Sequence, residues 1–268
     1  MMASVKEMDT YAKRWIKQAG GKLRESFETK LNIEEKTNPN DLVTNMDKAI
    51  EKFFVDNITS TFPGHRIFGE EGMGDDIKDL KGTVWIIDPI DGTLNFIHQQ
   101  RNFAISLGVY QEGIGIIGMV YDVVHDELYH AVKGHGAFMD DQRLAPLNEG
   151  SVSTSILSMN ASWVTENRRI DPNLLAPLVR DVRGTRSYGS AALELAFVAA
   201  GRLDAYITMR LMPWDFAGGV LLIEEVGGEV SDIKGEELDY LLGGSLFVSK
   251  PGLHKEVFKR YLSGNTKK

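Results

Sequence analysis

Apolar residues recur every three to four positions near the start of the chain, the spacing of one helix face. This pattern predicts a helix whose buried stripe consists of Met8, Ala12, Trp15, Ala19, Leu23 and Phe27. The periodicity is lost over residues 28–45, a charged segment that we expect to form a hairpin or mobile loop. A second helix is predicted to begin with Thr44 and Asp47 as a capping pair and to end at Pro63. Its apolar face comprises Ile50, Phe53, Phe54 and Ile58.

Short apolar runs separated by turn residues follow, which is typical of strands. The run 83–87 is predicted to end at Asp88, because Pro89 and Gly92 do not favour its continuation. An antiparallel meander is predicted from the runs 103–110, 116–124 and 127–132.

The second half alternates short strands with helices. Strands are expected near Ile156, Thr185, Ala205 and Phe247, and helices are expected to begin near Pro172, Ser190, Trp214 and Pro251. Small polar residues at 150–154 indicate a crossover between an N-terminal half, 1–150, and a C-terminal half, 151–268. The mixture of elements predicts an α+β fold.

Composition narrows the function classes. The 268 residues contain 30 Lys and Arg against 38 Asp and Glu, a formal charge of −8 that argues against nucleic-acid or anionic-membrane binding. Cysteine is absent, which excludes disulfides, zinc-thiolate sites and thiol nucleophiles. No apolar run approaches the ~18 residues that span a bilayer, and the charged N-terminal segment does not resemble a signal peptide. We therefore expect a cytoplasmic protein.

The segment Asp88-Pro89-Ile90-Asp91-Gly92-Thr93 carries the first candidate chemistry. Two carboxylates and the Ile90 carbonyl can face one point, and three oxygen ligands suit Mg²⁺ better than zinc. A turn closed by an aspartate side chain is the structural alternative. Two further acids, Glu70 within Gly-Glu-Glu-Gly and Asp215 after Trp214, favour the metal site. Taken singly, Glu70 could be a solvated acid, and Asp215 could only complement a helix dipole.

Six segments together resemble the inositol monophosphatase family of magnesium-dependent, lithium-sensitive sugar phosphatases, in particular its bacterial branch. They are Lys36 with residues 41–47, and residues 69–72, 85–96, 186–196, 201–206 and 214–228. The resemblance covers nearly the whole chain. It implies a layered α-β-α-β-α sandwich of the inositol monophosphatase and fructose-1,6-bisphosphatase type, a homodimer, and hydrolysis of inositol 1-phosphate and related phosphorylated polyols or sugars.

The resemblance also implies the metal ligands. One Mg²⁺ would be held by Glu70, Asp88 and the Ile90 carbonyl, and a second by Asp88, Asp91 and Asp215. A third, weaker ion would lie near Glu70, Mn²⁺ would be a possible substitute, and Li⁺ would inhibit. The ions would lower the pKa of bound water and neutralise phosphoryl oxygens.

Catalytic and substrate roles follow from the same resemblance. Asp47 and Thr93 would activate the attacking water together with Glu70 and its metal, whereas helix capping is the structural alternative for Asp47. Amides of Gly92 and Thr93 would hold phosphate. The other expected substrate contacts are Asp91, Gly189, Ala191, Thr208 and Asp215. Lys36 would lie on a mobile loop that closes over the metals.

Thr208 departs from the family pattern. The animal enzymes carry a glutamate seven residues before the helix aspartate, and this glutamate binds inositol hydroxyls. A neutral hydroxyl loses the stronger charge-assisted bond, so fructose 1,6-bisphosphate and NADP remain alternative substrates.

Other function classes are less well supported. Residues 113–118 match G-x-G-x-x-G, but a strand-like segment follows where a dinucleotide-binding helix is required, so a hairpin turn is predicted. A haloacid-dehalogenase-type phosphatase separates its two acids by one residue, whereas two residues separate Asp88 and Asp91. A non-catalytic, magnesium-dependent binding protein is disfavoured because Asp47, Thr93 and all the metal carboxylates are present.

Overall fold

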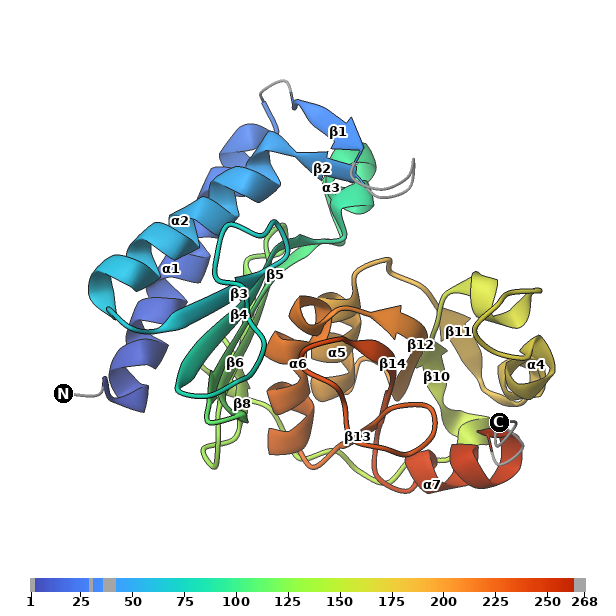
Figure 1. Cartoon of the computed structure of the whole chain (residues 1–268). Coiled ribbons are helices and arrows are strands. Elements are labelled where there is room, and N and C mark those ends of the chain that lie inside the picture. Colours follow the sequence, from blue (N-terminus) through green and yellow to red (C-terminus); the bar gives the residue numbers. More distant parts are fainter. Residues whose placement is uncertain (1–2, 29–30, 36–41, 263–268) are drawn as a thin grey trace.

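The two larger β-sheets alternate with three layers of helices in the computed structural model of the chain, which describes residues 3–28, 31–35 and 42–262 (Figure 1). The first layer contains α1 (Val5–Ser26) and α2 (Asn45–Thr61), which pack on a seven-stranded sheet. The middle layer contains α5 (Ala191–Ala199) and α6 (Pro213–Glu225). A five-stranded sheet follows, covered by α4 (Pro172–Asp181), α7 (Leu253–Val257) and the helical turn Phe258–Leu262. The predicted α-β-α-β-α sandwich is confirmed.

The two N-terminal helices form where the apolar periodicity predicts them. In α1, Met8, Ala12, Trp15, Ala19 and Leu23 are buried, and Phe27 is the residue after the last turn. The segment between the helices contributes strands β1 (Ile33–Glu35) and β2 (Leu42–Thr44), which pair antiparallel. Lys36 lies outside the described residues.

The seven-stranded sheet contains the predicted meander. Its order is β3-β4-β5-β6-β7-β8-β9, with β3 and β4 parallel and the other pairs antiparallel. Gly113 turns the chain between β5 and β6 with a φ of 80°, so the G-x-G-x-x-G segment forms the predicted hairpin. The strands are β3 (Arg66–Gly69), β4 (Thr83–Asp91), β5 (Ala104–Gln111), β6 (Ile114–Asp122), β7 (Glu127–Val132), β8 (Ala137–Met139) and β9 (Gln142–Arg143).

The prediction that the strand beginning at Thr83 ends at Asp88 is wrong, because this strand, β4, continues to Asp91. Pairing with β3 stops at Ile87, so the missing N–H of Pro89 breaks no bond on that side. On the other side, the register with β5 shifts between Asp88 and Asp91. This irregularity tolerates the proline. The seven-residue helix α3 (Thr93–Gln99) begins directly afterwards.

The five-stranded sheet has the order β11-β10-β12-β14-β13. Strand β10 is parallel to β11 and β12, and the other pairs are antiparallel. The strands expected from the sequence are present, whereas β13 was not predicted. Their bounds are β10 (Ile156–Ser158), β11 (Gly184–Arg186), β12 (Ala205–Leu211), β13 (Glu229–Ser231) and β14 (Gly244–Ser249). Short 3₁₀ turns cover Val152–Thr154 and Ala161–Val164.

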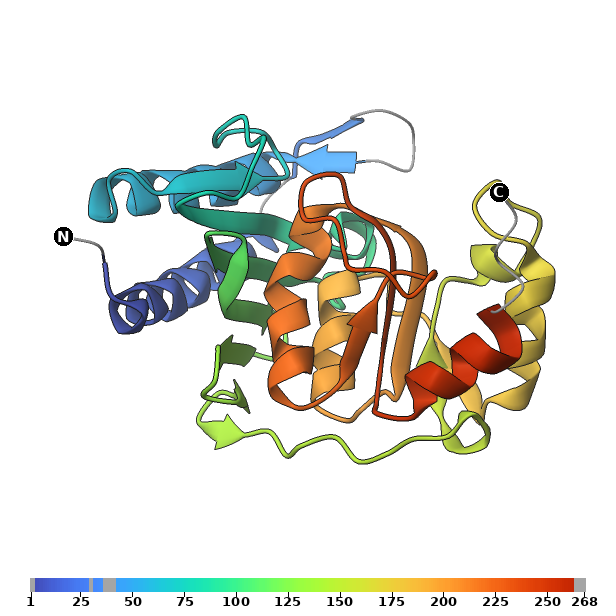
Figure 2. The same ribbon diagram turned by 60° about the horizontal axis from the view of Figure 1, so that its bottom comes forward.

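An extended segment, residues 144–151, carries the chain from the first sheet to the second (Figure 2). It is held at Leu147, whose N–H donates to the Val226 carbonyl, and at Gly150, whose N–H donates to the Pro251 carbonyl. We propose that the N-terminal half, 1–150, and the C-terminal half, 151–268, divide in this segment. Since α5 and α6 contact both sheets, the two halves share one helical layer.

Candidate active site

The end of β4 places two aspartates in the interior. Asp88 and Asp91 are 2% and 8% exposed. One oxygen of Asp88 accepts the Ile90 N–H at 2.9 Å. Asp91 reaches across to the start of α5, where its Oδ2 accepts the Ala192 N–H at 2.7 Å and the Ser190 hydroxyl. Asp91 therefore connects the first sheet to the middle layer of helices.

Helix α6 brings a third aspartate to the same place. Asp215 lies in its first turn, and its Oδ2 accepts the Met212 N–H at 2.8 Å. One carboxylate oxygen from each of Asp88, Asp91 and Asp215 lies within 4.8 Å of the others. Three converging oxygen donors fit a hard divalent cation such as Mg²⁺.

The electrostatics of this cluster also fit a cation. Burial, together with the neighbouring charges of Glu70, Asp91 and Asp215, raises the pKa of Asp88 well above its usual range. Burial and the Asp91 charge do the same to the pKa of Asp215. Burial raises the pKa of Asp91 to about 7, although its bonds from Ser190 and Ala192 oppose the shift. Carboxylates that resist ionisation because they repel one another are stabilised when a divalent cation lies between them.

The Asp47 carboxylate makes a contact that fits each of the two alternatives left open by the sequence, the helix cap and the approach to Thr93. Its Oδ2 accepts the backbone N–H of Thr44 at 2.7 Å and the Thr44 hydroxyl at 2.6 Å, completing a capping box on α2. Its Oδ1 lies 3.2 Å from the Thr93 hydroxyl, which is also 3.0 Å from the Ile90 carbonyl. Burial raises the pKa of Asp47 despite the bonds from Thr44, and this makes it a stronger base. Asp47 is therefore a helix cap that also contacts Thr93.

A cavity of about 250 Å³ opens beside Asp91 and Asp215. Besides these two acids, the predicted substrate residues Gly189, Ala191 and Thr208 line it, whereas Gly92 and Thr93 are not among its lining residues. Sequence reasoning missed other lining residues, among them Asn160, Trp163, Tyr206 and Arg210. Arg210 could have been found, because it lies two positions after Thr208 in β12 and thus on the same side of the strand. Asn160 and Trp163 carry no such signal, since they belong to an irregular segment and a 3₁₀ turn after β10.

The sequence model of the inositol monophosphatase family matches residues 4–264. The chain belongs to the inositol monophosphatase family. A relative named inositol-1-monophosphatase, from Bacillus subtilis strain 168, is 61% identical over 261 residues, covering 97% of this chain and 98% of its own.

Solved structures of inositol monophosphatases share the fold. SaIMPase-II with inositol monophosphate bound is 44% identical with a TM-score of 0.87, covering 96% of this chain and 94% of its own. An IMPase/NADP phosphatase complexed with Mg²⁺ and phosphate is 29% identical with a TM-score of 0.88, covering 96% and 95%.

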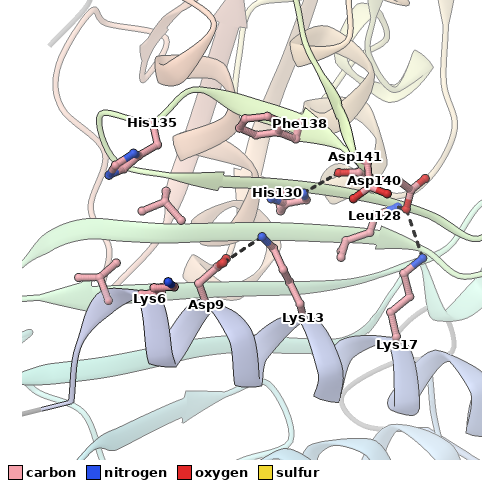
Figure 3. Close-up of a pocket in the computed structure, with 12 residues that line it drawn as sticks. Lys6, Asp9, Lys13, Lys17, Leu128, His130, His135, Phe138, Asp140 and Asp141 are labelled. Carbon is pink, nitrogen blue, oxygen red and sulfur yellow. Dashed lines mark hydrogen bonds and ion pairs between the residues drawn. The ribbon is translucent and has the colours of Figure 1, made fainter.

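A second cavity, of about 750 Å³, lies between α1 and β7–β8 and has no lining residue in common with the acidic cluster (Figure 3). None of the predicted site residues lines it. Its charged groups are largely paired with one another, with Lys13 2.9 Å from Asp9 and Lys17 3.3 Å from Asp140. We therefore assign the chemistry to the smaller cavity. Within the described ranges, no helix is long and apolar enough to cross a bilayer.

Proposed function

We propose that the protein is a magnesium-dependent phosphomonoesterase that hydrolyses inositol 1-phosphate and related small phosphates to the alcohol and inorganic phosphate. The observation that carries this proposal is the group of three aspartates whose oxygens lie within 4.8 Å, beside the contact between Asp47 and Thr93. Membership of the inositol monophosphatase family supports it. So does the name of the Bacillus subtilis relative.

The proposed metal ligands form two overlapping sets. Glu70, Asp88 and the Ile90 carbonyl would hold one ion, and Asp88, Asp91 and Asp215 the other, with a third, weaker ion near Glu70. Support comes from the charge of Glu70, which contributes to the raised pKa of Asp88 and so indicates proximity. Bound Mg²⁺ supplies a water of lowered pKa and neutralises phosphoryl charge. We expect Mn²⁺ to substitute and Li⁺ to inhibit.

Asp47 and Thr93 would orient the attacking water. A threonine hydroxyl has one proton to donate. When this proton points to Asp47 Oδ1, 3.2 Å away, the hydroxyl oxygen keeps lone pairs that can accept a hydrogen bond from water. The raised pKa of Asp47 favours its action as a base in this pair.

Substrate would span the acidic cluster and the 250 Å³ cavity. We expect the amides of Gly92 and Thr93, at the start of α3, to hold the phosphate. The polyol would then contact Gly189, Ala191 and Thr208. Arg210 is exposed at the same cavity and offers a cation to substrates with a second anionic group. This observation favours fructose 1,6-bisphosphate or NADP as further substrates.

Phosphate release from a panel of these compounds, measured with and without Mg²⁺, tests the proposal. Asp88→Asn is the control variant, because the loss of a shared ligand removes charge from both metal sets at once. We expect its turnover at saturating Mg²⁺ to fall by at least ~100-fold. A wild-type protein that binds Mg²⁺ and hydrolyses no member of the panel would instead support a non-catalytic binding protein. We also propose that the protein is a homodimer, which light scattering of the purified chain would test. A cytoplasmic location is a separate proposal, which fractionation of the cells would test.

A further inference from the structure

Glu51 is a buried carboxylate beside the active site that the proposed chemistry does not use. Its side chain, in α2, is fully buried. It follows Asp47 by one helical turn, so both acids lie on the same face of the helix. One carboxylate oxygen accepts the Glu71 N–H at 2.6 Å, and the other accepts the Met73 N–H at 2.7 Å. Both amides belong to the loop that follows β3 and carries Glu70.

Gly69, the last residue of β3, lies directly before this loop and faces the same carboxylate. A Cβ added to Gly69 would lie 2.4 Å from Cδ of Glu51 and 2.6 Å from each of its oxygens. A flexible side chain could normally move aside, but this one is buried and would give up both loop amides by moving. Gly69 therefore allows the loop backbone to lie directly on the Glu51 carboxylate.

We propose that Glu51 is a positioning residue that fixes Glu70 at the metal site and thereby sets the affinity for Mg²⁺. The inference rests on the proposed role of Glu70 as a ligand. Glu70 lies between Gly69 and Glu71, and both neighbours contact the Glu51 carboxylate. Its own N–H donates to the Ile87 carbonyl of β4 at 3.3 Å. Helix α2 thus contacts the site twice, through Asp47 at Thr93 and through Glu51 at the Glu70 loop.

Charge-assisted hydrogen bonds that backbone amides donate to both oxygens of a carboxylate hold a loop more firmly than bonds to a neutral acceptor. Groups that orient metal ligands in this way commonly change metal affinity or activity by about 10–100-fold when they are removed. We therefore expect Glu51→Gln and Glu51→Met to raise the Mg²⁺ concentration for half-maximal activity by about tenfold or more. Turnover at saturating Mg²⁺ should stay within about twofold, because Glu51 touches no reacting atom.

The measurement combines Mg²⁺ dependence of hydrolysis with calorimetric titration of Mg²⁺ into the substrate-free protein. Ile58→Val is the matched control. It removes a methylene from the buried face of the same helix, two turns beyond Glu51. A general loss of stability would move both variants alike, whereas the proposal predicts a changed Mg²⁺ half-saturation only for the Glu51 variants.

Gly69→Ala reaches the same contact from the loop side and guards against a Glu51 variant that folds poorly. It should raise the Mg²⁺ half-saturation in the wild-type background and add little in a Glu51→Ala background, where its Cβ has room. Fully additive effects, or a Mg²⁺ affinity of Glu51→Gln within about twofold of wild type, would overturn the inference. Because calorimetry needs no turnover, a wild type that binds Mg²⁺ without hydrolysis would defeat the proposed function and still decide the role of Glu51. A wild type that binds no Mg²⁺ would overturn both.

Discussion

The contact between α6 and the seven-stranded sheet should not tolerate a single added methyl group at Gly218. Gly218 follows Asp215 by one turn, and its backbone touches the sheet directly. A Cβ at this position would lie 2.5 Å from the Met119 carbonyl oxygen, 2.7 Å from Ser106 Oγ and 2.8 Å from the Leu107 nitrogen. Two of these three atoms are backbone atoms of the inner strands β5 and β6, which are held by neighbours on both sides. Gly218→Ala should therefore push the helix outward.

Two opposing effects determine how much Gly218→Ala changes the free energy of unfolding. Alanine favours a helix interior by about 1 kcal/mol over glycine. Overpacking a core contact typically costs about 1–3 kcal/mol. The upper part of this range applies here, because two of the three obstructing atoms are hydrogen-bonded backbone atoms that cannot turn away. We therefore expect a net loss of about 1–2 kcal/mol in the free energy of unfolding. Since α6 carries Asp215, its outward movement should also weaken Mg²⁺ binding.

Urea unfolding of the metal-free protein and Mg²⁺ titration of the folded protein measure the two effects. Gly21→Ala is the matched control, because Gly21 lies within α1 and no atom lies within 4 Å of its added Cβ. This control should gain up to about 1 kcal/mol from helix propensity and leave Mg²⁺ binding unchanged. If Gly218→Ala matches the wild type in stability and in Mg²⁺ affinity, close packing of α6 does not place Asp215.

Three further predictions concern catalysis, selectivity and pH. Thr93→Ala should lower turnover by at least ~100-fold and leave the Mg²⁺ affinity measured by calorimetry unchanged. Asp47→Asn should also lower turnover, and it should lower the free energy of unfolding by about 1 kcal/mol because Asp47 caps α2. The ratios of kcat/KM among inositol 1-phosphate, fructose 1,6-bisphosphate and NADP should correspond to free-energy differences of no more than ~1–3 kcal/mol, because Thr208 offers no charge. A preference for one substrate beyond about a thousandfold would contradict this prediction. Because the pKa of Asp91 is raised to about 7, the folded metal-free protein holds a proton that the unfolded chain releases near pH 4. The free energy of unfolding of the metal-free protein should therefore fall as pH rises from about 4 to about 7. The rise in Tm caused by Mg²⁺ should grow over the same pH range.

Elements with a long periodic pattern could be predicted from the sequence, because local spacing determines which face is buried. Helices α1 and α2 and the meander β5–β7 are of this kind. The strands β3 and β13, of four and three residues, were missed. The extension of β4 through Pro89 was also missed. This extension depends on where β3 stops pairing with β4, which is set by the tertiary structure and not by the local sequence.

The candidate site was predictable where neighbouring residues converge and less so where distant segments meet. Asp88 and Asp91 belong to one strand end, so their residue types and spacing already suggest a cation. The approach of Asp215 depends on glycine contacts between α6 and the sheet. The sequence marked Asp215 as a further candidate acid, but its place beside Asp88 and Asp91 was implied only by the family resemblance. The two roles of Asp47 could not be separated by sequence, because its contact with Thr93 joins residues 46 positions apart.

The place of Glu51 on the apolar face of α2 is a sequence signal that could have predicted its buried contacts. The buried face of α2 comprises Asp47, Ile50, Glu51, Phe54 and Ile58, so two acids lie on the apolar stripe of an amphipathic helix. An acid on the polar face is solvated and needs no explanation. An acid on the stripe loses its water, and its charged form is stable only when other groups supply hydrogen bonds or opposite charge. The position of an acid on such a stripe therefore predicts that a specific partner faces it. Here the partners are Thr44 and Thr93 for Asp47, and the Glu71 and Met73 amides for Glu51.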